Sequence, residues 1–211
     1  MPGLNSLSPR RQPRQRRARE TVERILTSTA ELLDEVGFER LTTNAVAERS
    51  GINVASLYGY FPNKFAILAA LWERAGREQR AFLAHALRDT GEETDLIDVV
   101  RRTLVAFAEL ALREPGHVEL AEAMRSAPEL AELWETERRQ AVAQLARLLR
   151  SQPDFEITRA ETERIAPVLI EATSGVSRLL RPSSPRRRGQ YVRELERMLT
   201  AYLETYRVAE E

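Results

Sequence analysis

The sequence predicts an all-α protein of about nine helices. Three observations support this fold class: apolar residues recur at helical spacing after residue 17, no segment alternates apolar and polar residues over the length of a strand, and aromatic residues make up only 6% of the 211-residue chain. The expected helices are 18–36, 44–50, 54–60, 64–88, 94–113, 117–125, 128–151, 159–181 and 185–207.

Local signals explain several of these helix boundaries. Gly37 is expected to end the first helix, because glycine adopts the left-handed conformation that other residues avoid. Pro128 and Pro185 suit first helical positions, where no amide donor is needed. Thr158 and Glu161 have the spacing of a capping box, in which each side chain satisfies the other residue's backbone amide.

The composition is ordinary for a soluble globular chain, with 43% apolar and 30% charged residues. Cysteine is absent, which excludes a disulfide framework, a thiolate metal site and a cysteine nucleophile. No apolar run approaches the ~18 residues of a membrane span, and the N-terminus has no apolar signal core. We therefore expect a cytoplasmic protein without a cofactor, a metal or a membrane contact.

Charge is distributed unevenly along the chain, although it sums to zero. Residues 1–19 contain six arginines and no acidic residue, and residues 1–64 contain ten basic and seven acidic residues. A basic front on an acidic body suggests that one end of the molecule faces a polyanion. Residues 1–17, with three prolines and no periodicity, are expected to form a flexible basic arm. The alternative is an arginine-rich tail without a partner.

Residues 42–64 read TTNAVAERSGINVASLYGYFPNK and predict two short helices joined by a turn. Thr43 is a plausible cap for the first helix, which Gly51 ends, and Asn53 caps the second. Leu57 is expected to face inward. Two short helices with a glycine-containing turn of three or four residues form a helix-turn-helix, whose second helix fits the major groove of DNA.

The outward residues of the second short helix suit a DNA surface. Asn53, Val54, Ala55, Ser56 and Gly59 are small, so the backbone can approach base pairs closely. The flanking residues Tyr58 and Tyr60 carry hydroxyls that can reach phosphates, although partial burial is an alternative for each.

Lys64 is the only lysine of the chain and falls in the first turn of the next predicted helix. The helix dipole disfavours a cation there, unless a phosphate binds the free amides at that end. A solvated charge is the alternative.

The stretch resembles the DNA-binding segment of the tetracycline repressor (TetR) family, which reads approximately T-T-x-x-I-A-x-x-A-G-V-S-x-G-x-L-Y-x-H/Y-F-x-x-K-x-x-L. At the specified positions of this pattern the chain has Thr42, Thr43, Val46, Ala47, Ser50, Gly51, Ile52, Asn53, Ala55, Leu57, Tyr58, Tyr60, Phe61, Lys64 and Ile67. The chain departs from the pattern at Ala55, where the family has glycine, and at Asn53, where it has serine.

The resemblance implies a DNA-binding domain over residues 18–63 and an effector-binding and dimerisation domain over residues 64–211. It further implies specific roles in contacting double-stranded DNA: phosphate contacts for Thr43, Tyr58, Tyr60 and Lys64, and base contacts for Val54, Ala55 and Ser56. The implied protein is a repressor that binds a palindromic operator.

A homodimer is expected, because one short recognition helix contacts too few base pairs for a specific site. Heptad-like apolar seams run along the last two predicted helices, and the TetR family dimerises through these two helices. The alternative is that both seams face the core of a single chain. The predicted interface residues are Ile165, Leu169, Ala172, Val176, Leu179, Val192, Leu195, Leu199, Tyr202 and Tyr206.

The resemblance also implies a small-molecule effector, held among the middle helices, whose binding moves the two DNA-binding domains. The candidate residues are mainly apolar, so an effector that they enclose would be lipophilic. The alternative is that they form an ordinary hydrophobic core, which also requires apolar residues at helical spacing. The candidate lining residues are Leu104, Phe107, Met124, Trp134 and Thr173.

Two other classes of function fit the sequence less well. An enzyme is not expected, because the two histidines lack metal-binding spacing and the chain has neither a phosphate-binding glycine loop nor a nucleophile elbow. The alternative to a DNA regulator is an all-α adaptor for a protein partner, in which the helix-turn-helix is only scaffold. An adaptor would not show salt-dependent binding to duplex DNA.

Overall fold

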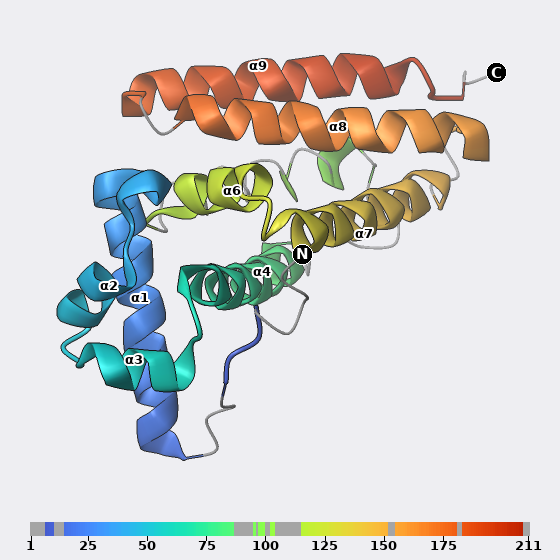
Figure 1. The fold of residues 1–211 in the computed structure, drawn as a ribbon. Coiled ribbons are helices and arrows are strands. Elements are labelled where there is room, and N and C mark those ends of the chain that lie inside the picture. Colours follow the sequence, from blue (N-terminus) through green and yellow to red (C-terminus); the bar gives the residue numbers. More distant parts are fainter. Residues whose placement is uncertain are drawn as a thin grey trace. The chain divides into compact units, whose positions relative to one another are not determined.

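A computed structural model of the chain describes residues 7–10, 15–86, 95, 97–99, 102–103, 115–151, 155–180 and 183–208. The protein is all-α, as the sequence predicts (Figure 1). The helices of the described residues, with the labels of Figure 1, are α1 (Arg16–Arg40), α2 (Thr43–Arg49), α3 (Val54–Tyr60), α4 (Lys64–Ala86), α6 (His117–Ser126), α7 (Ala131–Arg150), α8 (Arg159–Leu180) and α9 (Pro185–Glu204). Residues 97–99 and 102–103 are also helical, while the other residues of the predicted helix 94–113, except 95, lie outside the described residues.

The chain divides into two compact units. Unit 1 comprises Met1–Glu78 and Arg113–Glu135, and unit 2 comprises Gln79–Leu112 and Thr136–Glu211. Unit 1 is larger than the predicted DNA-binding domain of residues 18–63, because one hydrophobic core includes side chains from α1 to α4 and from α6.

The core of unit 1 forms around the apolar face of α1. Ile25 and Leu33 of α1 are fully buried, as are Leu57 of α3, Leu68 of α4 and Met124 of α6. Each such side chain contributes roughly 1.5–3 kcal/mol by leaving water. This shared core holds the helix-turn-helix against α1.

The backbone of α1 changes direction at Gly37, whose φ of 74° and ψ of 173° are non-helical. One further turn follows and closes with a 3.2 Å hydrogen bond from the Leu41 amide to the Phe38 carbonyl. The prediction that the regular helix stops at Gly37 is therefore confirmed by the backbone, although helical geometry resumes as far as Arg40. Few residues other than glycine adopt this conformation.

The N-terminus of α6 contacts α1 through Gly116. The Gly116 amide donates a 2.9 Å hydrogen bond to Asp34 Oδ1, and the residue has a φ of +67°. A Cβ atom at Gly116 would lie 2.3 Å from the Ala30 carbonyl oxygen. Close approach and left-handed backbone together require glycine here, a requirement that the sequence pattern does not reveal.

The start of α7 differs from the prediction. Pro128 lies in a turn, and the helix begins at Ala131 instead of at residue 128. The Leu130 carbonyl accepts the first intrahelical bond, from Trp134 at 2.9 Å, and the Leu130 amide donates to Ala127 at 3.0 Å. A proline suits a turn as well as a first helical turn, so its presence alone did not fix the boundary.

Helices α8 and α9 of unit 2 pack against each other over an apolar core. The predicted capping box precedes α8: Thr158 donates to Glu161 Oε2 from its amide at 2.8 Å and from its hydroxyl at 2.6 Å. The Glu161 amide donates in return to Thr158 Oγ1 at 3.3 Å. These donors lower the pKa of the Glu161 carboxyl group. Pro185 is the first residue of α9, as predicted.

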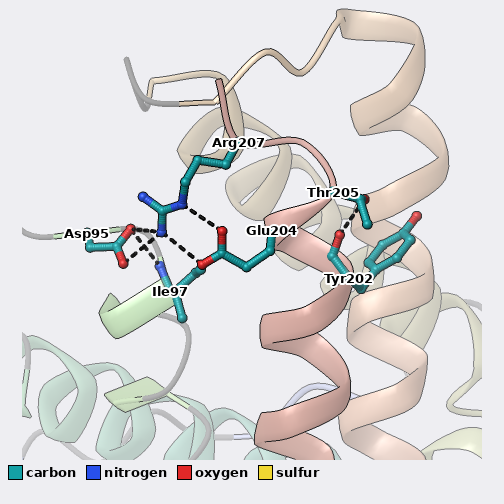
Figure 2. A network of polar contacts seen from close by, with 6 residues as sticks. All are labelled: Asp95, Ile97, Tyr202, Glu204, Thr205 and Arg207. Atoms are coloured by element: carbon teal, nitrogen blue, oxygen red, sulfur yellow. Dashed lines mark hydrogen bonds and ion pairs between the residues drawn. The ribbon is translucent and has the colours of Figure 1, made fainter. Parts of the chain in front are cut away.

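Arg207 connects the end of α9 to a segment more than a hundred residues earlier (Figure 2). Its guanidinium donates to both carboxylate oxygens of Asp95 at 3.0 Å and to Glu204 at 2.7 and 3.2 Å. The same group lies 5.0 Å from the centre of the Phe155 ring. The two carboxylates raise the pKa of Arg207. This network holds the C-terminal end of α9 within unit 2.

Among the described helices, none combines the length and the apolar character that a membrane crossing requires.

Candidate nucleic-acid interface

Helix α2 is closed at both ends by its own sequence. At its start, the Ala45 amide donates to Thr42 Oγ1 at 3.2 Å, so the cap is Thr42 and not Thr43 as predicted. Two adjacent threonines offer the same hydroxyl, and only the backbone conformation decides between them. At its end, Ile52 and Gly51 donate to the carbonyls of Ala47 and Glu48 at 3.0 and 3.1 Å, which is a complete Schellman motif.

Helix α3 follows after the turn at residues 50–53 and is capped as predicted. The Ser56 amide donates to Asn53 Oδ1 at 2.7 Å. Leu57 and Phe61 are fully buried in the core of unit 1, which fixes the rotation of the helix about its axis. Asn53, Val54, Ala55, Ser56 and Gly59 are all exposed. The predicted inward and outward faces of α3 are thus both confirmed.

Two hydroxyl groups meet beside this exposed face. Thr43 Oγ1 and the Tyr58 phenol share a hydrogen bond of 3.0 Å, and 39% of the Tyr58 side chain is exposed. Both hydroxyls are able to donate or accept, so the pair can present a donor to a phosphate while staying bonded to each other. The structure therefore brings together two of the residues predicted to contact phosphates.

The orientation of α2 relative to α1 is held by Arg49. Its guanidinium donates to both carboxylate oxygens of Glu35, at 2.9 and 2.6 Å, and lies 3.5 Å from Glu31. Donation by Arg49 lowers the pKa of Glu35, and the carboxylates raise the pKa of Arg49. Arg49 is thus engaged within the protein and is not a free cation for DNA.

Tyr60, at the end of α3, is half-buried against the core of unit 1. Its carbonyl accepts a 2.8 Å hydrogen bond from the Arg10 amide. Leu7 packs against the same core. Residues 7–10 of the predicted arm therefore contact the DNA-binding unit at the end of α3, a contact that the composition of the arm does not predict.

Lys64 lies in the first turn of α4, as predicted, and Asn63 caps that helix by accepting from the Ala66 amide at 2.9 Å. The side chain of Lys64 is half-buried, and its ammonium lies 4.3 Å from the centre of the Phe38 ring and 5.7 Å from that of Phe65. Cation–π contacts restrain this charge in a helix terminus where the dipole is unfavourable. Phe38 is a positioning residue that the sequence reasoning missed.

The candidate effector residues fall in different parts of the structure. Met124 is fully buried in unit 1, and Trp134 is half-buried with its ring centre 5.6 Å from that of Trp72. Thr173 lies in unit 2, where its hydroxyl donates to the Leu169 carbonyl at 2.9 Å. Leu104 and Phe107 lie outside the described residues.

The ten predicted interface residues differ in burial. Four pack inside the core of unit 2: Ile165, Leu169, Leu195 and Leu199. Four are half-buried: Ala172, Val176, Val192 and Tyr206. Leu179 and Tyr202 are exposed, and so are two apolar residues outside the predicted seams, Val168 and Met198. A heptad-like seam shows that a helix has an apolar face, but not whether that face meets the same chain or a second one.

Two short capped helices, a buried inner face and an exposed outer face of small residues define a helix-turn-helix of the DNA-binding class. Comparison of the sequence with known protein families supports this assignment. The sequence matches the family described as bacterial regulatory proteins, tetR family, over residues 25–71, and the tetracyclin repressor-like C-terminal domain over residues 95–203. The second match covers more than half of the chain. The chain belongs to the TetR family of DNA-binding transcriptional regulators, which are not enzymes.

Individual curated relatives are similar over only part of the chain. The tetracycline repressor protein class C of Escherichia coli is 47% identical over 51 residues, which are 24% of this chain and 23% of that protein. The nucleoid occlusion factor SlmA of Vibrio vulnificus (strain YJ016) is 32% identical over 95 residues, which are 44% of this chain and 47% of that protein. The matches thus span between about a quarter and half of these curated relatives.

Solved structures share the fold over nearly the whole chain. A TetR-family regulator from Streptomyces coelicolor has a TM-score of 0.64 at 23% identity, covering 88% of this chain and 99% of that chain. A TetR-family regulator from Syntrophomonas wolfei has a TM-score of 0.71 at 14% identity, covering 88% and 95%. At these identities the likeness establishes the fold.

Proposed function

We propose that this protein is a repressor that binds a palindromic operator as a dimer and releases it when a small lipophilic effector binds. Residues 18–63 form the DNA-binding domain, to which Lys64 adds a phosphate contact, and residues 64–211 supply effector binding and dimerisation. The observation that carries the proposal is the exposed face of α3, which is capped by Asn53, packed from behind by the buried Leu57 and composed mostly of small residues.

Phosphate contacts on both sides of this face would hold α3 in the major groove. Thr43 and Tyr58 offer a bonded pair of hydroxyls on one side. Lys64 offers an ammonium whose position is restrained by Phe38 and Phe65. Such contacts set the register of the protein on the duplex and make its affinity depend on salt. Tyr60 is proposed to add a contact through its phenol.

The exposed apolar residues of α8 and α9 are the proposed centre of the dimer interface. Val168, Leu179, Met198 and Tyr202 are 59%, 47%, 51% and 37% exposed in the single chain. Large apolar side chains on both members of one helix pair are well suited to a bundle with a second copy. Two heads joined in this way would bind half-sites one helical turn apart, about 34–36 Å, or a multiple of it.

Effector binding is proposed to act through α6. Met124 lies on this helix, and the Gly116 amide at its start is bonded to Asp34 of α1 within the same unit. A ligand that displaces Met124 would therefore act on a helix that contacts α1 directly. Trp134 and Thr173 remain proposed lining residues.

Duplexes selected from a random pool by the full-length protein at fixed salt test the DNA-binding part of this proposal. Lys64→Ala is expected to weaken binding about equally for all sequences and to reduce the slope of log K against log salt by about 0.9 per head. Tyr58→Phe is expected to weaken binding further, because it removes one hydroxyl of the pair. Arg197→Ala, which alters a 75% exposed cation on α9, is the matched control and should change neither quantity.

If Lys64→Ala and Tyr58→Phe together leave duplex affinity unchanged, the assignment of this face to DNA is wrong. Binding of a protein partner without salt-dependent duplex binding would instead favour an adaptor. Screening small molecules for release of the selected duplex then tests the effector. A protein that activates transcription from the selected site would contradict the repressor assignment. A protein that none of the screened molecules releases from the duplex would contradict its release by a small effector.

A further inference from the structure

The exposed face of α3 lacks the side chains that usually distinguish bases by hydrogen bonding. In the major groove, arginine and lysine bind guanine, asparagine and glutamine bind adenine, acidic residues bind cytosine, and apolar groups contact the C5-methyl group of thymine. Residues 53–60, all of them described, contain no arginine, lysine, glutamine or acidic residue. Their one amide side chain is that of Asn53.

The amide of Asn53 is already used by the fold. Its Oδ1 accepts the Ser56 amide at 2.7 Å, which turns the side chain toward the N-terminus of its own helix. A two-bond contact with adenine needs both ends of the amide directed at one base. The capping bond holds the Asn53 amide against its own helix, which disfavours the two-bond contact with adenine.

The hydroxyl of the exposed Ser56 can bond to more than one base and so distinguishes bases poorly. Apolar groups are therefore the contacts of this helix that can select a base. Val54 is 37% exposed, and Ala55 next to it is exposed as well. Positions 55 and 56 lie four and three residues before Gly59, so all three share one side of α3. Small side chains and the bare Gly59 thus form this side of the helix, and the methyl groups of Val54 and Ala55 lie at its start.

Gly59 leaves room for another molecule to come close to this face. Its φ is not left-handed, and an added Cβ would meet no atom of the chain within 4 Å, so neither backbone conformation nor internal packing requires glycine. Glycine weakens a helix. A short side chain such as that of Ala55 can touch a base only if the helix lies deep in the groove, and a bare position at Gly59 permits that depth.

We propose that this protein recognises its operator by the C5-methyl groups of thymines, with Val54 and Ala55 as the contacting residues. This inference rests on the proposed DNA-binding function of α3 and specifies the sequence that α3 selects. Affinity comes from the phosphate contacts of Thr43, Tyr58 and Lys64, and selectivity comes from methyl groups. Half-sites should therefore carry thymines opposite the start of α3.

Replacing thymine by deoxyuridine tests the proposal, because it removes the C5-methyl group and leaves base pairing and the O4 acceptor unchanged. Full-length protein is titrated with the selected duplex, and with duplexes in which single thymines are replaced, at fixed salt. Removing one contacted methyl group should lower the affinity about fourfold. Removing one such group from each of the two half-sites should lower it about sixteenfold, because the two effects multiply. Thymines outside the half-sites should have no effect.

Variants identify the contacting residue. Val54→Ala should lower affinity for the thymine duplex and abolish most of the difference between thymine and deoxyuridine at one position. Val208→Ala changes another exposed valine, 42% exposed in unit 2, and should leave that difference intact. Asn44→Ala, on the exposed side of α2, should weaken both duplexes equally, since the first helix of the motif crosses the backbone.

A second measurement adds the methyl group to another base. In a duplex with cytosine at a contacted thymine position, 5-methylcytosine should bind more tightly than cytosine by about the same fourfold. The proposal is overturned if specific, salt-dependent binding persists while deoxyuridine and 5-methylcytosine change nothing, and in that case the proposed function stands. If no duplex is bound in a salt-dependent way, the proposed function itself is wrong and the inference fails with it.

Discussion

Gly59→Ala separates what the fold needs from what the DNA interface needs. The backbone of Gly59 is helical, and the added Cβ would meet no other atom within 4 Å. Alanine is more favourable than glycine inside a helix by about 0.5–1 kcal/mol. We therefore expect this variant to raise the free energy of unfolding by about that amount, which corresponds to roughly 1–4 °C in the melting temperature of a chain of this size.

The same substitution should weaken DNA binding. The new methyl group would stand on the exposed face of α3, four positions after Ala55, where we expect the closest approach to the base pairs. Overfilling a packed contact costs about 1–3 kcal/mol, so duplex affinity should fall by about 5- to 150-fold per head. Urea unfolding measures the gain in stability, and titration of the selected duplex at fixed salt measures the loss of affinity.

Gly189→Ala provides the matched control on α9. Its added Cβ would meet only the guanidinium of Arg193, with Nη1 at 3.2 Å and Cζ at 4.0 Å, which is the end of a flexible side chain that can move. This variant should be stabilised to a similar degree with no change in duplex affinity. Unchanged binding by Gly59→Ala would refute a close approach at this position. A loss of stability would refute our assignment of open space around it.

Two further substitutions are expected to lower the free energy of unfolding, and a third is expected to change the pKa of a carboxyl group. Gly116→Ala should lower the free energy of unfolding by about 2–4 kcal/mol, because it combines a left-handed φ with a 2.3 Å approach to the Ala30 carbonyl; equal urea midpoints would contradict this. Leu57→Ala should cost about 2–5 kcal/mol in the same assay, since the side chain is fully buried, and a cost under about 1 kcal/mol would show that the site collapses. The lowered pKa of Glu161 contributes stability above the unfolded value of about 4.3, and this is lost as pH falls through the folded value. Thr158→Ala should raise that folded pKa toward the ordinary value in an NMR titration, and an unshifted pKa would exclude the Thr158 hydroxyl as its cause.

The sequence was most informative where a signal and its effect lie within a few residues. Gly51, Asn53 and the pair of Thr158 and Glu161 act on backbone groups three to five positions away, and each makes the predicted bond or turn. Thr42 and Thr43 both carry a hydroxyl that can cap α2, and the predicted cap, Thr43, was one residue too late. A proline at residue 128 suited both a turn and a helix start, and the turn was the outcome.

By itself, then, the sequence determined the all-α fold class, the caps at Gly51, Asn53 and Thr158, and the two faces of α3, because apolar period and backbone hydrogen bonding are local properties. Only the tertiary structure decided which apolar helix faces pack within the chain. Ile165 and Leu195 belong to the heptad-like seams predicted for a dimer, and both are buried in the core of unit 2. It also decided the contacts of Gly116 with α1 and of Arg10 with Tyr60, which join residues 82 and 50 positions apart. Such contacts produce no periodic pattern in the sequence, because they depend on how the helices pack in three dimensions.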